Sequence, residues 1–482
     1  MKLNSIIKDA PDIDIEQLST DSRLPMKNAI FFCLNGLKYD GHDYIDEAIN
    51  NGAKVIIYQD DIKAIGNAIF IKVKDVVKTL SLIASVFYNK PNDNINEYVV
   101  GGCYGRSSVS HIINYYLSKQ SSCGSVGVFG INYKDKHLSM AYPTLTPLEN
   151  IKVLDNLKKN NINNCIFETN AKSLFYKKLD VLDPNIFIYT NTSKLSKDFK
   201  ECNGFYYQYI RNYLYTLEDK TLVLLNRDDE SYNELKDCSN SIITYGHNDS
   251  CDYVIDNIKL HIDKTEFLIK HNNKEYSISS NLLGIVNVYN ITAAIASLHL
   301  LGHDINDVIN FVSNVPYVSG VMEKIDKEYN IIIDCANELD SIENIFKFAR
   351  NTCKNNLICV IGINYSDNDN KIEKLVSLCN EYVDRVIYTE NESSVSEVIS
   401  ILEKTYKYSS VNNGICIPYR SVALENGINI INKNDTLLVL GKGNENFLMM
   451  GLGKEAYDGD LFYLNKFLNK RKEEENGIEQ IY

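Results

Sequence analysis

The sequence predicts an α/β protein with a central, doubly wound parallel sheet of the phosphate-loop (P-loop) type and a C-terminal Rossmann-like domain. One observation is a β-branched run at 98–100 that enters a glycine-rich turn and then a helix-forming stretch at 109–119. Another is the alternation of short apolar runs with intervals long enough for helices, which is typical of parallel sheets. This alternation occurs both before and after residue 319 and therefore indicates two such layers.

Composition and charge limit the classes of protein to consider. The chain has 482 residues, 44% hydrophobic and 23% charged, as expected for a globular protein of about two to four domains. The net charge of -13 argues against nucleic-acid binding. The 12 cysteines occur singly, which favours a reducing compartment over a zinc site or disulfide framework. Because no apolar run approaches about 18 residues, we expect a cytoplasmic protein without membrane contact.

The first part of the chain, 1–92, reads as a small α/β domain that ends at a polar, proline-containing break at 90–93. Its loop at 35–44 contains Gly36 and Gly41, which favour either close approach to a ligand or a plain connector. The pattern gives the two readings equal weight. The expected elements are a strand at 29–34, a helix at 44–51 and a strand at 54–58.

The turn between the strand and the helix near residue 100 is the strongest functional candidate in the second part, 93–318. Gly102 and Gly105 shape it, and Arg106, Ser107 and Ser108 open the helix. Such a turn presents backbone N–H groups and a helix N-terminus to an anion, so the stretch resembles a phosphate loop. An ordinary tight turn fits the spacing equally well, because Arg106 stands where a phosphate loop carries Lys.

The other runs of the second part place Glu168 at the end of a strand. Carboxylates at the carboxyl ends of parallel strands face the crevice where ligands bind, so Glu168 is a metal-ligand candidate, with a solvated strand end as the alternative. Residues 252–274 predict a β-hairpin, and 283–290 lead into a helix at 291–301. The expected parallel strands lie at 125–129, 164–168, 186–190 and 222–225.

The third part, 319–482, repeats the alternation. Its last strand is followed by Gly441–Glu445, where Lys442 stands between two glycines. This stretch predicts an anion or carboxylate contact, or a flexible surface turn. The charged run at 470–475 predicts a solvated end. The expected strands lie at 331–334, 357–361, 386–389 and 436–440.

Seven stretches, taken in order, resemble the Mur ligase family, and in particular the type that adds the third peptide residue to UDP-N-acetylmuramoyl-L-alanyl-D-glutamate. The resemblance covers essentially the whole chain. It is carried by 21–23 with 31–36 and 40–45, the loop at 101–108, Thr144–Glu149, Phe167-Glu168, Leu283–Ala294, Val318–Glu323 and Gly441–Glu445.

The resemblance implies a three-domain amide ligase of peptidoglycan synthesis. ATP would phosphorylate the terminal carboxylate of the peptide, and an amine would attack the acyl phosphate. The implied domains are a UDP-binding domain at 1–92, an ATPase domain at 93–318 and an amino-acid-bringing domain at 319–482, with ATP and Mg²⁺ as cofactors.

The resemblance also implies roles for individual residues. Arg106, Glu168 and Arg211 take the catalytic positions, and Ser107 and Glu168 the Mg²⁺ ligands. The nucleotide would contact Gly102, Gly105, Arg106, Ser107, Ser108, Asn287 and Asn290. The UDP-sugar would contact Ser22, Thr144, Thr146, Asn170 and Lys178, and the incoming amino acid Gly441, Lys442, Gly443, Asn444 and Glu445.

The chain departs from the family mainly at metal- and phosphate-handling positions. Arg106 replaces the loop Lys, and Arg211 replaces a Lys that the family carbamylates to hold a second Mg²⁺. Ser193–Lys197 stands in place of the D-H-L-D ligands, and Glu390–Ser393 in place of the D-N-P-R motif that selects diaminopimelate. Further replacements are Val321, Asn337 and Asn444, where the family has Arg, His and His.

Two hypotheses follow. In the first, the chain is an ATP-dependent ligase that acts on a UDP-muramyl-peptide-like acceptor. In the second, it is a catalytically inactive homologue that binds such a nucleotide-sugar peptide, or a partner such as an active Mur ligase, as a regulator or scaffold. Each missing metal or phosphate contact costs several kcal/mol of transition-state stabilisation, and about 1.4 kcal/mol is already tenfold in rate.

Overall fold

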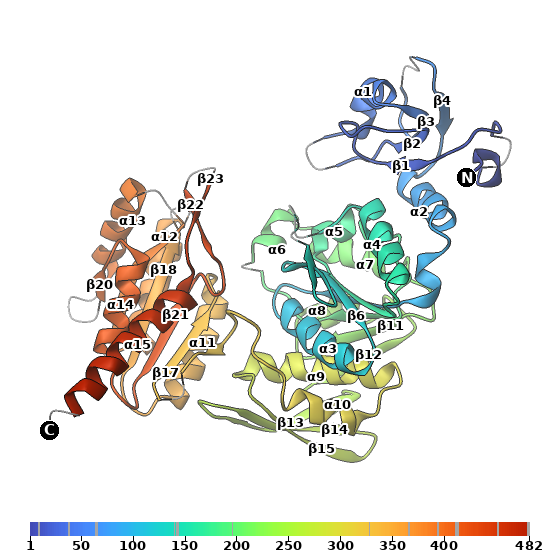
Figure 1. Cartoon of the computed structure of the whole chain (residues 1–482). Helices are drawn as coiled ribbons and strands as arrows, with labels where there is room; N and C mark the ends of the chain where they lie inside the picture. The colour runs from blue at the N-terminus through green and yellow to red at the C-terminus, as the bar shows by residue number, and fades with distance from the viewer. Residues whose placement is uncertain are drawn as a thin grey trace. The chain divides into compact units, whose positions relative to one another are not determined.

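The computed structural model of the chain divides into two compact units, each built of helices on sheets (Figure 1). Unit 1 comprises Met1–Val254 and Asn290–Val308, and unit 2 comprises Ile255–Tyr289 and Ile309–Tyr482. Leu195 and Ser393, which belong to the sequence patterns above, and 37–38 of the first loop lie outside the described residues. The structure describes 1–7, 10–36, 39–62, 66–138, 140, 144–194, 196–326, 328–364, 367–392, 395–409, 414–450 and 453–479.

The N-terminal part of unit 1 is a parallel sheet of four strands in the order β1-β2-β3-β4. All four residues of β2 are buried, which explains its unbroken apolar sequence. The expected strand, helix and strand are present as β2, α1 and β3. The elements are β1 (Gln17–Ser19), β2 (Ala29–Phe32), α1 (Ile45–Asn50), β3 (Ala53–Tyr58), β4 (Ile69–Lys72) and α2 (Val76–Phe87).

The second sheet of unit 1 confirms the predicted doubly wound layer. Its parallel strands follow the order β12-β11-β10-β5-β9-β6, and β7 and β8 extend it as antiparallel strands. The strands are β5 (Asn96–Gly101), β6 (Cys123–Gly127), β7 (Gly130–Tyr133), β8 (Lys136–Leu138), β9 (Asn164–Glu168), β10 (Ile186–Tyr189), β11 (Leu222–Asn226) and β12 (Ile242–Gly246). The helices are α3 (Arg106–Gln120), α4 (Pro147–Lys159), α5 (Ala171–Phe175), α6 (Lys197–Glu201), α7 (Tyr206–Leu214) and α8 (Ser231–Leu235).

The predicted helix at 291–301 begins earlier than expected. Helix α9 (Ile285–Leu300) follows Gly284, whose φ of +87° makes the turn into the helix. The β-branched residues at its start oppose the helix only weakly, because their helix penalty is small beside the apolar area that packing buries. As a result, Asn287 and Asn290 lie on the first two turns of the helix. Helix α10 (Ile305–Val312) follows.

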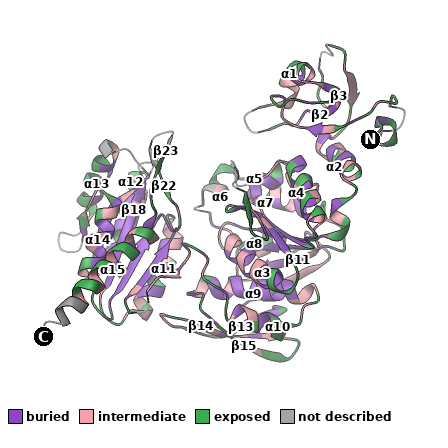
Figure 2. Cartoon of the chain, viewed as in Figure 1, coloured by how far each residue is buried: buried purple, intermediate pink, exposed green. Residues whose placement is uncertain are grey.

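Unit 2 contains a six-stranded sheet in the order β16-β17-β21-β18-β19-β20, parallel except for β16. This confirms the Rossmann-like layer. Figure 2 shows its strands buried and the outer sides of α13 and α15 exposed. The strands are β16 (Glu323–Lys324), β17 (Asn330–Asp334), β18 (Leu357–Asn364), β19 (Arg385–Glu392), β20 (Gly414–Cys416) and β21 (Thr436–Leu440). The helices are α11 (Leu339–Thr352), α12 (Asp369–Tyr382), α13 (Val395–Tyr408), α14 (Arg420–Ile430) and α15 (Asp460–Glu479).

Two further groups of strands remain, of which the first begins at the end of unit 1. The hairpin predicted at 252–274 is present as β13 (Tyr253–Leu260) and β14 (Thr265–His271), and β15 (Lys274–Ser280) pairs with β14. Strands β22 (Phe447–Met450) and β23 (Gly453–Ala456) form a two-stranded sheet. Among the described residues, no helix is both long and apolar enough to cross a membrane.

The charged run at 470–475 is only in part the solvated end that the sequence predicts, since Lys470, Glu473 and Glu474 are exposed. It lies in α15, where the Arg471 guanidinium donates to the carbonyl oxygen of Ile431 at 2.7 Å and lies over the ring of Tyr329. Lys472 Nζ pairs with Asp326 at 2.6 Å. The spacing of charges along one helix does not reveal partners that come from distant parts of the chain.

Candidate functional site

The turn after β5 has a backbone that only glycine permits at two positions. Gly102 has a φ of +126° and Gly105 a φ of +79°. A Cβ at Gly102 would lie 2.1 Å from Thr190 Oγ1, and one at Gly105 would lie 2.3 Å from Asn290 Oδ1. The glycines therefore allow both a left-handed backbone and close approach of neighbouring side chains.

The strand next to β5 holds this turn in place. The carbonyl oxygen of Tyr104 accepts bonds from Thr190 Oγ1 at 2.6 Å and from Asn191 Nδ2 at 3.0 Å. The Cys103 amide donates to Asn191 O at 2.9 Å. Because α3 begins directly after the turn without a side-chain cap, the amides of its first residues stay outside the helical bonding, as in an anion-binding helix end.

Arg106 does not extend away from the turn. Its Nη1 donates to the carbonyl oxygen of Gly102, so that the guanidinium lies across its own loop. A Lys in this position would carry one charged ammonium on a flexible chain, whereas the guanidinium is a planar group with several fixed donors. The replacement noted in the sequence therefore changes the form of the cation as well as its size.

The two predicted Mg²⁺ ligands are brought together. Ser107 Oγ donates to Glu168 Oε2 at 2.9 Å, across the end of β9. Burial raises the pKa of Glu168, while the Ser107 hydrogen bond and the positive charge of Arg106 oppose this shift. Both side chains line a polar cavity of about 310 Å³. Its other lining residues are Ser110, His111, Asn114, Ser125, Gly127, Phe129, Gly130 and Asn132.

Of the two asparagines predicted at the nucleotide, Asn290 lies against the loop through its approach to Gly105. Asn287 Nδ2 instead donates to Leu283 O at 2.8 Å, one turn back along α9. The structure thus joins Asn290 to the turn, and a nucleotide contact of Asn287 stays a prediction.

Three of the residues predicted at the UDP-sugar form one hydrogen-bonded group. Lys178 Nζ donates to Thr144 Oγ1 at 2.9 Å, and Ser173 Oγ donates to the same hydroxyl at 3.0 Å. Asn170 caps α5 by accepting from the Ser173 amide. Thr146 caps α4 in a capping box with Glu149, which accounts for it structurally.

The remaining UDP-sugar candidate, Ser22, belongs to the N-terminal sheet region. It is buried, its hydroxyl donates to Glu47, and its carbonyl oxygen accepts from Asn51 Nδ2 at 2.8 Å. These contacts shape the loop before β2. A role in uridine binding stays a prediction.

Arg211, the third predicted catalytic residue, lies on α7. Its Nη1 pairs with Glu234 Oε2 of α8 at 3.2 Å, and both side chains are more than a third exposed. Arg211 therefore has a carboxylate partner on the neighbouring helix, which the sequence pattern did not reveal.

The third group of predicted residues meets other motifs at the carboxyl ends of β17 and β21. A Cβ at Gly320 would lie 2.2 Å from the Asn444 nitrogen, and one at Gly443 would lie 2.7 Å from Gly320 O. The Gly441 amide donates to Asp334 O at 3.0 Å. We call Gly320, Asp334 and Gly441–Glu445 the C-terminal junction.

Two buried charges mark the C-terminal junction. Lys442 is fully buried, and its Nζ lies 3.2 Å from Glu445 Oε2. Asp334 accepts from the amides of Met322 at 2.8 Å and Ala336 at 2.7 Å. Burial raises the pKa of Asp334 to about 6, against the effect of these two bonds. The tight packing excludes the flexible-turn reading of Gly441–Glu445.

Sequence reasoning missed three residues that the structure places at these sites. Asp198 follows directly after the Ser193–Lys197 stretch. Burial raises its pKa, and the charge of Arg106 acts against that shift, so the two groups are neighbours. In unit 2, Arg420 and Asp460 form a fully buried pair at 2.6 Å. Arg420 and Asp460 are forty residues apart, so no local sequence pattern pointed to the pair. Asp198, in contrast, lies next to the Ser193–Lys197 motif and could have been found from it.

The described residues fit the cofactors that the resemblance implies only in part. Ser107 and Glu168 offer the oxygen ligands that Mg²⁺ prefers, so one ion fits there in kind. A second ion does not fit, because Arg211 and Lys194 are cations and each is paired with a glutamate of the α7–α8 region. The loop amides suit phosphate.

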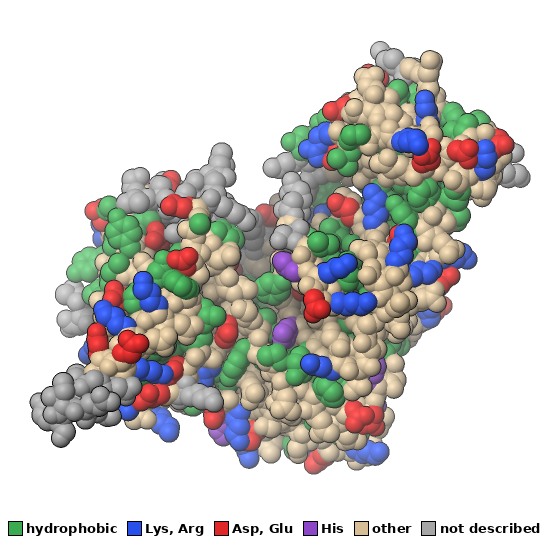
Figure 3. Space-filling model, viewed as in Figure 1, with side chains coloured by type: hydrophobic (Ala, Val, Ile, Leu, Met, Phe, Trp, Pro, Cys, Tyr) green, Lys and Arg blue, Asp and Glu red, His purple; other side chains and the backbone are tan. Residues whose placement is uncertain are grey.

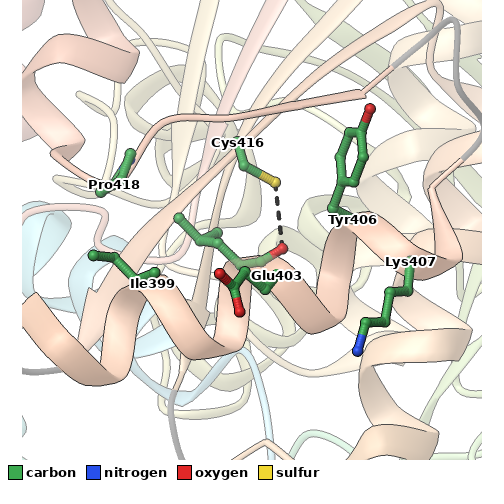
Figure 4. Close-up of a pocket in the computed structure, with 7 residues that line it drawn as sticks. Ile399, Glu403, Tyr406, Lys407, Cys416 and Pro418 are labelled. Atoms are coloured by element: carbon green, nitrogen blue, oxygen red, sulfur yellow. Dashed lines mark hydrogen bonds between the residues drawn. The ribbon is translucent and has the colours of Figure 1, made fainter.

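A separate hollow of about 420 Å³ lies on unit 2 beside α13 (Figure 4). Cys416 Sγ donates to Leu402 O at 3.5 Å at its floor. None of its lining residues belongs to the motifs above. On the face shown in Figure 3, acidic and basic side chains are interspersed.

Comparisons with known proteins agree with this arrangement. Three family models match successive parts of the chain: "Mur ligase family, catalytic domain" at 14–88, "Mur ligase middle domain" at 100–298 and "Mur ligase, glutamate ligase domain" at 321–443. UDP-N-acetylmuramyl-tripeptide synthetase 2 of Oceanobacillus iheyensis is 28% identical over 455 residues, 92% of each chain. A UDP-N-acetylmuramoyl-L-alanyl-D-glutamate–2,6-diaminopimelate ligase of Clostridioides difficile is 28% identical over 489 residues, 98% of this chain and 100% of that one.

Solved structures share the fold over nearly the whole length. A UDP-N-acetylmuramoyl-L-alanyl-D-glutamate–2,6-diaminopimelate ligase superimposes with a TM-score of 0.75 at 19% identity, covering 98% of this chain and 99% of that one. MurF ligase from Thermotoga maritima, in complex with ADP, gives a TM-score of 0.62 at 15% identity over 95% and 98% of the two chains. With three matching models in series and the same architecture throughout, the chain belongs to the Mur ligase family.

Proposed function

We propose that the chain is an ATP-dependent amide ligase that joins an amino acid to the peptide of a UDP-N-acetylmuramoyl acceptor through an acyl phosphate. The observation that carries this proposal is the turn after β5, built on Gly102 and Gly105, with Glu168 and Asn290 against it. The two relatives reported above, which are named as a synthetase and a ligase of UDP-muramyl peptides, support the acceptor class.

The central residues suit the first half of such a reaction. The amides at the start of α3 and the Arg106 guanidinium would hold the phosphates, since several negative oxygens must be gathered at one point. Mg²⁺, when bound by Ser107 and Glu168, would supply further positive charge at the transferring phosphoryl group. Thr144, Asn170 and Lys178 would orient the acceptor from the hydrogen-bonded group that they form.

The C-terminal junction suits the second half. Lys442 would offer a buried positive charge to the carboxylate of the incoming amino acid, with Gly441 and Gly443 letting the ligand approach the backbone. Asn444 and Glu445 follow as polar contacts. We propose domain boundaries at 92 and 318, so that these residues belong to a separate amino-acid-bringing domain that closes to exclude water from the acyl phosphate.

The test is phosphate release by the purified chain with ATP, Mg²⁺, UDP-N-acetylmuramoyl-dipeptide and a panel of amino acids. We expect release that depends on one class of amino acid. Glu168→Gln should lower this rate by at least about 100-fold, because a carboxylate at the phosphoryl group is lost. Asp155→Asn, which changes a carboxylate paired with Lys159 on α4, is the matched control and should leave the rate unchanged. No amino-acid-dependent release from any combination would exclude the ligase function.

A second candidate function is that of a catalytically inactive homologue that binds a nucleotide-sugar peptide, or an active Mur ligase, as a regulator. The contact of Arg106 with its own loop favours it, as do Val321, Asn337 and Asn444 in place of charged or imidazole groups. Thermal-shift measurements separate the two. Stabilisation by UDP-N-acetylmuramoyl-dipeptide without any by ATP supports the inactive homologue, and stabilisation by both supports the ligase.

A further inference from the structure

The side chain of Arg106 is a fixed part of the turn after β5. It begins α3, immediately after Gly105, and its Nη1 donates to the carbonyl oxygen of Gly102, four residues earlier. The turn is itself anchored to Asn191 through the Cys103 and Tyr104 amides. A guanidinium held in this way keeps its positive charge at the mouth of the loop, where the free amides of the helix end are found.

The charge of Arg106 acts on carboxyl groups from two other elements. Burial raises the pKa of Glu168, at the end of β9, and the Ser107 bond and Arg106 oppose the shift. Burial likewise raises the pKa of Asp198, on α6, and Arg106 is the largest influence against it. The guanidinium, which its bond to Gly102 O holds at the turn, carries the opposite charge to both carboxyl groups.

Glu168 and Asp198 also have partners other than Arg106. Ser107 Oγ donates to Glu168 at 2.9 Å, and the Ala171 amide donates to Asp198 at 3.4 Å. A divalent ion that took both carboxylates would have to displace these protein donors. One polar atom is different: Ser110 Oγ is buried, lines the same cavity beside Glu168 and makes no well-formed hydrogen bond among the described residues.

We propose that Arg106 is the built-in counter-charge of this loop and that phosphate groups bind there without a divalent metal ion. A guanidinium has five N–H donors, so the bond to Gly102 O leaves others for phosphate oxygens. The orphan Ser110 hydroxyl marks the adjacent cavity as a place for a polar ligand atom. The inference rests on the proposed nucleotide site, but it concerns binding and not turnover.

The first experiment is calorimetric titration of the full chain with ADP and with inorganic pyrophosphate, once in EDTA and once in excess Mg²⁺. We expect both ligands to bind in EDTA, and Mg²⁺ to change the ADP Kd by less than about threefold. A Kd at least about tenfold tighter in Mg²⁺, or no binding in EDTA, would overturn the proposal.

The second experiment uses Arg106→Gln, which removes the charge and shortens the side chain while keeping a polar amide. We expect ADP binding in EDTA to weaken by at least about tenfold, with partial recovery in Mg²⁺, because the metal then supplies the missing charge. Unchanged or tighter binding would overturn the proposal, and tighter binding would show that Arg106 blocks the loop.

The matched control is Arg350→Gln in unit 2, where an arginine paired with Asp384 at 3.0 Å is changed in the same way. Its ADP Kd should stay within about twofold of the parent.

Arg106→Lys replaces Arg106→Gln if the latter does not fold. Binding of ADP to Arg106→Lys should then depend on Mg²⁺, and binding that stays independent of Mg²⁺ would contradict the requirement for a guanidinium. Metal-independent ADP binding without ligase turnover refutes only the proposed function, and turnover with metal-dependent binding refutes only this inference.

Discussion

The turn after β5 and the C-terminal junction are built in opposite ways. At the turn, polar side chains satisfy one another: Arg106 bonds to Gly102 O, and Ser107 bonds to Glu168. At the junction, backbone packs on backbone, and a Cβ at Gly320 would lie only 2.2 Å from the Asn444 nitrogen. Backbone packing tolerates almost no change in volume, whereas polar side chains can exchange partners.

This difference explains where the chain departs from its family. Both regions keep the glycines that their backbones require, and both replace side chains that carry the chemistry in the family. At the turn, Arg106, which stands in place of a Lys, bonds to the carbonyl oxygen of Gly102. At the C-terminal junction, Val321 and Asn444 are replacements, while the glycines of the motif are kept. Within the same motifs, the glycine backbone therefore contributes stability, and the side chains carry the chemistry.

The largest effect that would test this comparison is expected from Gly320→Ala. The new Cβ would meet the Asn444 nitrogen, and the φ of +70° is unfavourable for alanine. We expect the free energy of unfolding to fall by at least about 4 kcal/mol, measured by urea denaturation followed by circular dichroism.

Gly459→Ala is the control for Gly320→Ala. Gly459 has a φ of +94°, but the nearest atom to its Cβ would be Glu445 O at 3.7 Å, so only backbone strain of about 1 kcal/mol is expected. Equal losses in the two variants would show that left-handed backbone, and not backbone contact, limits the junction.

The second effect concerns the opposite end of β5 from the turn, where Glu97 is buried. It accepts from the Asp183 amide and Asn92 Nδ2, both at 2.8 Å, and burial raises its pKa to about 8. Between the unfolded pKa of 4.5 and about 8 the folded chain holds one proton more. Stability should therefore fall as pH rises, by about 1.4 kcal/mol per pH unit, and Glu97→Gln should remove this slope.

Urea midpoints measured from pH 5 to 8 for both chains give the difference in slope, which is independent of any constant loss caused by the amide. An unchanged slope in Glu97→Gln would mean that another group controls the pH dependence. In that case, the buried Glu97 would not account for the pH dependence of the stability.

A third, smaller effect is expected from Asp334→Asn at the junction. The amide cannot accept from both the Met322 and the Ala336 amides, so one buried donor is left without a partner. We expect a loss of about 2 kcal/mol in the free energy of unfolding. Asp369→Asn, an exposed residue near Lys404, should cost less than about 0.5 kcal/mol and provides the baseline.

The smallest effect is expected from Arg211→Ala in unit 1. The pair of Arg211 with Glu234 is largely solvated, so its loss should change the free energy of unfolding by less than about 0.5 kcal/mol. A double-mutant cycle with Glu234→Ala isolates the coupling between the two side chains. A coupling above about 1.5 kcal/mol would show that side-chain pairs near the turn stabilise the fold as strongly as the junction does.

Much of the fold was predictable because its strands are short, apolar and buried on both faces. The predicted strand at 164–168 is β9, residue for residue, and 436–440 is β21. Helix α9 begins six residues before the predicted 291, because the weak preference of its β-branched residues is outweighed by the burial of the whole helix. The charged run of α15 is solvated only in part because its partners, Ile431 and Asp326, come from elsewhere in the chain.

The candidate site divides in the same way. The pairing of Ser107 with Glu168 and the position of Gly105 follow from the strand–turn–helix pattern. The contact of Arg106 with Gly102 O does not, because a pattern specifies which residue follows a turn but not where its side chain goes. The partner of Arg211 and the proximity of Asp198 to Arg106 were likewise invisible.

The sequence by itself determined the family, the α/β class and the places where the backbone must be glycine, since local conformation and burial are written in residue type and spacing. Only the tertiary structure decided which charges meet: Arg106 with its own loop, Arg420 with Asp460, Lys442 with Glu445. The physical reason is that electrostatic and hydrogen-bond energies depend on distances of a few ångströms between groups that folding brings together from separate segments.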